Sequence, residues 1–134
     1  MKVFIDSNIP MYVAGRDHPN RDPARRFLDV VRAGSVDACT STEVLQEILF
    51  RYSGLARVDL MAKVYDLFVQ LCPAVLPVTL ADTDRAKTLL STLGGLSARD
   101  AVHAAVMLNH DIHAVATFDQ GFDRVPAIRR VPLA

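Results

Sequence analysis

The stretch that most constrains the fold is a short apolar run near the start of the chain, Val3-Phe4-Ile5, which stops abruptly at Asp6-Ser7-Asn8. Continuous runs of Val, Ile and Phe are typical of parallel strands that are buried on both faces. Open α/β proteins bind their ligands at the carboxyl edge of such a sheet. We therefore expect Asp6 at a ligand-binding edge. Asp, Ser and Asn are also preferred N-caps, so the same three residues could simply begin a helix predicted over 9–13.

The remaining sequence alternates between strand-like and helix-like segments. Further strands are predicted at 36–39, 74–78, 113–117 and 128–131, and the second of these, which prolines flank, is expected at a sheet edge. Helices are predicted from Pro23 to the stop at Gly34, and over 40–52, 58–71, 82–93 and 97–109. This alternation predicts one domain, 1–134, with a three-layer α/β/α sandwich around a central, mostly parallel sheet of four to five strands.

Composition excludes several classes of protein. No apolar run reaches the length of a membrane span, and the N-terminus does not read as a signal peptide, so we expect a cytoplasmic protein that does not enter a membrane. The charges of fifteen basic and fifteen acidic residues cancel, so the chain lacks the strong positive electrostatic field of a protein that coats nucleic acid non-specifically. This weakens the case for a nucleic-acid partner without excluding one. Cys39 and Cys72 lack the spacing of a zinc site and are expected as buried, reduced thiols.

Four acids share one relation to the predicted sheet. Asp6 ends the first strand and Asp119 follows the fourth. Glu47 lies in the second turn of the helix after the second strand, and Asp100 lies in the first turn of the Ala-rich helix over 97–109. Strand ends and the following helix starts lie on one edge of a parallel sheet, so all four are expected on one face of the protein.

Ordinary structural roles explain some acids better than others. Asp100 stands three residues after Ser97, as in a capping box, and Asp119 could cap the turn before Phe122. Glu43 matches a capping box with Thr40, Thr40-x-x-Glu43. Glu47 has the weakest structural explanation, because it lies beyond the turn in which a carboxylate benefits from the helix dipole.

Several ionised carboxylates share a small site only when a positive group joins them. An all-oxygen set of Asp and Glu suits Mg²⁺ or Mn²⁺. Such an ion can polarise a phosphodiester and lower the pKa of a bound water, so the predicted chemistry is metal-assisted phosphodiester hydrolysis. His103 lies one turn after Asp100, but a lone His on an Ala-rich helix is more typical of a satisfied core residue than of a metal ligand. His18, His110 and His113 are assigned no role.

Four short motifs in this order resemble the PIN-domain ribonucleases, in particular the VapC-type toxins of bacterial and archaeal toxin–antitoxin pairs. They are Val3-Phe4-Ile5-Asp6-Ser7-Asn8, Ser41-x-x-Val44-Leu45-x-Glu47, Ser97-Ala98-Arg99-Asp100-Ala101-x-x-Ala104-Ala105 and Thr117-Phe118-Asp119-x-x-Phe122. Each motif is weak alone. Together, in this order, they are fairly specific, and the resemblance covers essentially the whole chain.

The resemblance implies a Mg²⁺- or Mn²⁺-dependent endoribonuclease whose acidic quartet is Asp6, Glu47, Asp100 and Asp119. Asp6 and Asp100 would be the most direct metal ligands, and the other two would complete the charge and orient water. Hydrogen bonds from Ser7, Asn8 and Thr117 would support the site, and Asp123 resembles an occasional fifth acid. The resemblance also implies an RNA substrate, a homodimer, and a cognate antitoxin that blocks the acidic pocket, often with an Arg.

Two other interpretations were weighed against a nuclease. A haloacid-dehalogenase-type phosphatase needs an acid two residues after the first Asp, where this chain has Asn8, and a response-regulator receiver needs a Lys after its last strand. The three lysines, Lys2, Lys63 and Lys87, are not so placed. A catalytically inactive PIN-like module that binds an Arg-rich partner peptide through its acidic pocket stays open as the alternative function.

Overall fold

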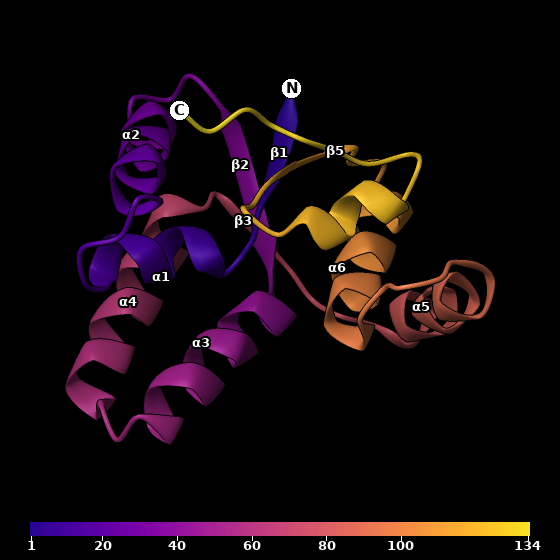
Figure 1. The fold of residues 1–134 in the computed structure, drawn as a ribbon, viewed down its shortest axis with the longest axis horizontal. Helices are drawn as coiled ribbons and strands as arrows, with labels where there is room; N and C mark the ends of the chain where they lie inside the picture. Colours follow the sequence, from indigo (N-terminus) through magenta and orange to yellow (C-terminus); the bar gives the residue numbers. More distant parts are fainter.

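Five parallel strands form the central sheet of the computed structural model, which describes residues 1–134 (Figure 1). The strands are β1 (Lys2–Ile5), β2 (Asp37–Ser41), β3 (Ala74–Leu76), β4 (Ala114–Ala116) and β5 (Arg129–Arg130). Their order is β3-β2-β1-β4-β5, and every pair is parallel. The expected edge position of β3 is confirmed, and β1 lies at the centre of the sheet.

Six helices and one 3₁₀ helix surround the sheet. They are α1 (Asn8–Ala14), α2 (Arg21–Arg32), α3 (Thr42–Gly54), α4 (Val58–Leu71), α5 (Leu80–Thr92), α6 (Ala98–Asn109) and η1 (Gln120–Arg124). Figure 1 shows α1, α2 and α4 on one side of the strands and α5 and α6 on the other, with α3 leaving the lower end of β2. The predicted three-layer α/β/α sandwich is thus confirmed. None of the helices combines the length and the apolar character that a membrane crossing would need.

The apolar strands form the centre of the core. Val3, Phe4 and Ile5 are fully buried, and so is most of α6, including Ala101, Ala104 and Ala105. Burial of these side chains on several faces explains why the sequence of α6 is apolar nearly all round. The core therefore fixes β1 and the first turn of α6, which carry two of the acids.

Both cysteines are buried and form no disulfide, as expected. Burial raises the pKa of the Cys39 thiol to about 11 and that of Cys72 to about 12. Both thiols stay protonated at neutral pH, so they are inert packing groups.

Three helix starts differ from the sequence prediction. β2 extends to Ser41, so Thr40 lies inside the strand, where its hydroxyl donates to the Ile5 carbonyl at 3.0 Å. Ser41 is the N-cap of α3 and accepts from the Val44 N–H at 3.3 Å. The predicted Thr40–Glu43 capping box is therefore wrong by one residue, because the strand is longer than its apolar run.

By contrast, α2 and α5 each begin two residues before the predicted start. α2 begins at Arg21, so Pro23 is its third residue; a proline fits there because N–H groups of the first turn have no partner within the helix. α5 begins at Leu80, because Thr79 is its N-cap and the Thr79 N–H donates to the Asp82 carboxylate at 2.9 Å. Neither start follows from the spacing of apolar residues. The start of α5 is set by a local hydrogen bond, and the start of α2 includes a proline that the unpaired N–H groups of a first turn allow.

The corrected cap of α3 can be tested by stability measurements. Ser41→Ala removes the acceptor of a buried N–H and should lower the free energy of unfolding by about 1 kcal/mol. Glu43→Gln, which loses only a first-turn charge, should lower it by less than about 0.5 kcal/mol. Urea unfolding followed by circular dichroism measures both variants. Equal effects of the two substitutions would contradict the assignment of Ser41 as the cap.

Candidate active site

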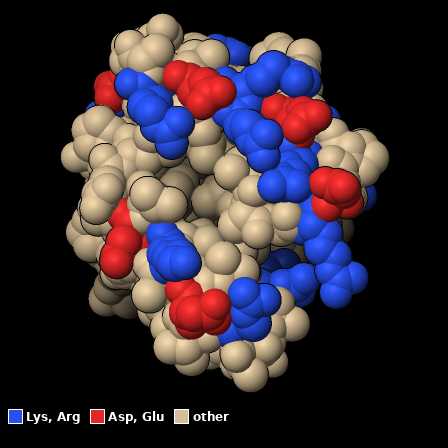
Figure 2. All heavy atoms as spheres, turned by 90° about the vertical axis from the view of Figure 1, so that its left-hand side faces the viewer, with Lys and Arg blue, Asp and Glu red and all other residues tan.

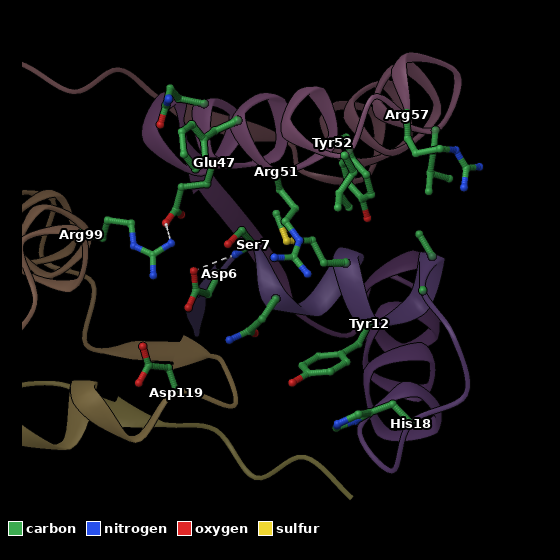
Figure 3. A pocket seen from close by; sticks show the side chains of 18 of the residues that line it. Asp6, Ser7, Tyr12, His18, Glu47, Arg51, Tyr52, Arg57, Arg99 and Asp119 are labelled. Carbon is green, nitrogen blue, oxygen red and sulfur yellow. Dashed lines mark hydrogen bonds and ion pairs between the residues drawn. The ribbon is translucent and has the colours of Figure 1, made fainter.

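The four acids predicted to share one face meet at a single cavity (Figure 3). Asp6 follows β1, Glu47 lies in the second turn of α3, Asp100 in the first turn of α6, and Asp119 at the start of η1. All four line the same cavity, together with Ser7 and Asn8. The parallel topology brings them together from segments that are far apart in the sequence. Their catalytic and metal-binding roles stay predictions.

A short hydrogen-bond network holds Asp6. The Ser7 N–H donates to Asp6 Oδ1 and the Thr117 hydroxyl donates to Asp6 Oδ2, both at 2.7 Å. Asn8 Nδ2 in turn donates to Thr117 Oγ1 at 3.0 Å. Ser7 occupies the N-cap position of α1 without a side-chain capping bond. The Asp6 carboxylate, only 5% exposed, is thus oriented by the site rather than used as a helix cap.

Asp100 and Asp119 lie next to each other, with Gly121 close to both carboxylates. Ser97 caps α6 by accepting from the Asp100 N–H at 3.1 Å. Asp119 caps η1 by accepting from the Gly121 N–H at 2.8 Å, so the predicted turn cap is confirmed in a residue that also lines the cavity.

Gly121 is a site residue that the sequence analysis missed. A Cβ at this position would lie 2.6 Å from Asp100 Oδ2 and 3.1 Å from Asp119 Oδ1. Only a residue without a side chain leaves room for both carboxylates there. In the sequence, Gly121 is recognisable only as a glycine two residues after an acid that follows a strand. This pattern is too common to identify a site residue.

His103 was expected as a satisfied core residue, and this expectation is wrong in part. Its imidazole is buried, at 1% exposed, between Phe4 and Phe122. However, Nε2 lies 2.7 Å from Glu47 Oε1 and 3.8 Å from Asp6 Oδ1, while Nδ1 has no hydrogen-bond partner. His103 therefore belongs to the acidic cluster. The sequence feature that pointed to His103 was its spacing of one helical turn from Asp100 on α6. In the structure, however, the imidazole lies against Glu47 and Asp6.

Burial and mutual repulsion dominate the electrostatics of the cluster. Burial raises the pKa of Asp6, although His103 and the hydrogen bond from Thr117 partly oppose it. Burial, together with Asp119 and the charge of Asp6, raises the pKa of Asp100 to about 7. Burial also disfavours the His103 imidazolium, but its hydrogen bond with Glu47 and the surrounding carboxylates outweigh this and raise the pKa of His103. The site thus holds more negative charge than its own cations neutralise.

One further cation reaches the cluster from the surface. Arg99 Nη1 lies 3.4 Å from Glu47 Oε2, and its side chain is 71% exposed while Glu47 is 7% exposed (Figure 3). Asp123, by contrast, lies outside this cavity, and Arg130 binds it with two contacts of 2.9 and 3.0 Å. The structure does not bring the suggested fifth acid to the site.

The residues present fit a divalent cation. Asp6, Glu47 and His103 each have one potential ligand atom in a common cluster. These three atoms all lie within 4.8 Å of one another. Asp100 and Asp119 add carboxylate oxygens on the same cavity. A set dominated by carboxylates suits Mg²⁺ or Mn²⁺, and a bound cation would remove the repulsion that raises the pKa of Asp100.

An α/β/α sandwich with acids gathered at its carboxyl edge is also the architecture of a known family. The family model described as "PIN domain" matches residues 3–128. The chain therefore belongs to the PIN-domain family, as its motifs suggested.

Its relatives within that family are VapC ribonucleases. Ribonuclease VapC13 of Mycobacterium tuberculosis is 40% identical over 129 residues, which cover 96% of this chain and 98% of the relative. Two solved structures share the fold at lower identity. The VapBC2 complex of Rickettsia felis, bound to a promoter DNA fragment, has a TM-score of 0.77 at 18% identity and covers 98% of each chain. VapC20 of M. tuberculosis, a sarcin–ricin loop cleaving toxin, has a TM-score of 0.73 at 21% identity and covers 90% of this chain and 92% of that one.

The raised pKa of Asp100 gives a pH dependence with a definite sign. Its value of about 7 in the folded chain exceeds the ordinary value of 3.8. Between these two values the folded state binds more protons than the unfolded state, so Asp100 makes the metal-free protein less stable as the pH rises. Asp100→Asn removes this contribution. In EDTA, the melting temperature of Asp100→Asn relative to that of the parent chain should therefore rise from pH 4 to pH 7. A difference that does not vary with pH would contradict the charged cluster.

Proposed function

We propose that the chain is a Mg²⁺- or Mn²⁺-dependent endoribonuclease that hydrolyses RNA phosphodiester bonds, and that it is the toxin component of a type II toxin–antitoxin system. The observation that carries the proposal is the convergence of Asp6, Glu47, Asp100 and Asp119 on one cavity. Asp6, Glu47 and Asp100 are buried there with only His103 and Arg99 as cationic neighbours. Buried acids in this number need a cation, and folding alone gives no reason to gather them.

The residues of the site take distinct roles in this proposal. Asp6 and Asp100 are the most direct metal ligands, and Glu47 and Asp119 complete the negative charge and orient water. Ser7, Asn8 and Thr117 fix Asp6 through their hydrogen bonds. When bound, the cation supplies polarisation of the phosphodiester and eases loss of a proton from water.

The partners follow from the relatives and from the charge of the site. VapC13 is a ribonuclease, and another structure with the same fold, from Klebsiella pneumoniae, is a toxin–antitoxin complex, which supports RNA as substrate and an antitoxin as partner. The Arg99–Glu47 ion pair places one guanidinium against an acid of the site, which supports an antitoxin Arg as a group that neutralises these carboxylates in place of the metal. We further propose a cytoplasmic homodimer, as is implied by the family. The inactive binding module is not favoured, because the relatives are ribonucleases.

Substitution of single carboxylates tests the proposal. Asp6→Asn and Asp100→Asn each keep the shape of the side chain but remove a ligand charge, and each should abolish Mg²⁺- or Mn²⁺-dependent cleavage of RNA. The loss should be at least about a hundredfold, as expected for removal of a group that acts in the transition state. The measurement is gel-resolved cleavage of total cellular RNA by the purified chain.

Glu43→Gln is the matched control, because Glu43 lines the same cavity without contacting Asp6, Glu47 or His103. It should keep most of the activity. Cleavage by both Asn variants at the parent rate would exclude the acidic quartet as the active site. Absence of RNA cleavage by the parent chain in either metal would exclude the nuclease itself.

A further inference from the structure

The cavity extends well beyond the four acids. Its volume is about 1530 Å³, far larger than a hydrated cation needs. In Figure 3 the acids occupy one end, and Tyr12, His18, Arg51, Tyr52 and Arg57 lie toward the other end. One cavity thus joins an acidic end to an aromatic and basic end. The second end has no role in metal binding, so it is available to hold the substrate.

Helix α3 links the two ends with a regular spacing. Glu47 and Arg51 are one helical turn apart and both line the cavity. Four residues of α-helix span about 6 Å along the axis. This is close to the separation of successive phosphates in an extended nucleic-acid strand. A strand whose scissile phosphate lies near Glu47 therefore places its next phosphate near Arg51.

Arg51 is free to bind such a phosphate. Its side chain is exposed and makes no hydrogen bond or ion pair, whereas Arg57 is paired with Asp59 and Arg99 with Glu47. The neighbouring surface favours the approach of a polyanion as well. On the face that carries α1, α2 and α4, Lys and Arg side chains lie beside a hollow with Asp and Glu side chains among them (Figure 2), and α2 alone carries four Arg and two Asp.

Tyr12 lines the same cavity as Arg51 and supplies an aromatic surface there. Its ring centroid lies 4.6 Å from that of His18 and 5.3 Å from that of Phe118, with a nearly perpendicular arrangement in the second pair. A base can stack on such a ring whatever its identity, because every base has a π-face. Bases in a duplex are stacked on each other, so only an unpaired nucleotide can reach the ring.

We propose that the Tyr12–Arg51 end of the cavity binds the nucleotide next to the scissile phosphate of a single-stranded RNA substrate. Arg51 binds the phosphate of this nucleotide and Tyr12 stacks on its base. The inference rests on the proposed nuclease function and adds two substrate-binding residues to it.

Binding measurements separate the two contacts. The probe is a fluorescent single-stranded RNA of mixed sequence, and a blunt duplex of equal length is the comparison. Binding is measured by fluorescence anisotropy in the presence of Ca²⁺. A gel checks that the probe stays intact. The parent chain should bind the single strand more tightly than the duplex. Arg51→Gln should weaken binding and reduce the slope of log affinity against log salt by about 0.7, the value for one phosphate contact on a single strand. Tyr12→Leu should weaken binding by about fivefold or more with no change in slope.

Arg85→Gln is the matched control. Arg85 lies on α5, on the other side of the sheet, is exposed, and does not line the cavity. It should change neither affinity nor slope. An unchanged affinity and slope in Arg51→Gln, or a duplex bound as tightly as the single strand, would overturn the inference. The inference would also be overturned if Arg51→Gln left RNA binding unchanged but abolished binding of the antitoxin. A parent chain that shows this binding pattern but cleaves no RNA in Mg²⁺ would instead contradict the nuclease function.

Discussion

The site depends on one electrostatic constraint, the confinement of several carboxylates with too little positive charge. Asp6 and Glu47 are almost completely buried, and burial with neighbouring acids raises the pKa of Asp100 to about 7. Water cannot screen these charges as it would at the surface. His103 and Arg99 neutralise only part of the cluster. The folded chain therefore holds a site that gains stability from any added cation.

The parallel sheet is what makes this arrangement rigid. Each acid is attached to the end of a strand or to the first turns of a helix that leaves the same edge, and the buried β1 lies at the centre. A rigid cluster cannot relax by moving its carboxylates apart. Both candidate neutralising groups, a metal ion and a partner's guanidinium, address the same excess charge. Under the proposed function, catalysis and inhibition by an antitoxin would share this physical basis.

Features that follow from backbone periodicity could be predicted from the sequence. The apolar runs identified the strands, and their alternation with helices gave the parallel sheet, which in turn placed Asp6 and Asp100 on one edge. Features that depend on side chains packing across distant segments could not be predicted in this way. Glu47 meets His103 only because α3 and α6 pack together, and Gly121 matters only because Asp100 approaches it. The cap of α3 shifted from Thr40 to Ser41, because hydrogen bonding extends β2 past its apolar residues.

The central claim is that the buried acids form a site for a divalent cation, and Mn²⁺ soaked into crystals of the chain tests it most directly. Anomalous diffraction locates this ion without any assumption about activity. We expect an anomalous peak in the cavity within coordination distance, about 2.1 Å, of carboxylate oxygens of Asp6 and Asp100. A cavity without a peak at saturating Mn²⁺ would contradict the metal site, and would favour a receptor for the arginine of a partner protein.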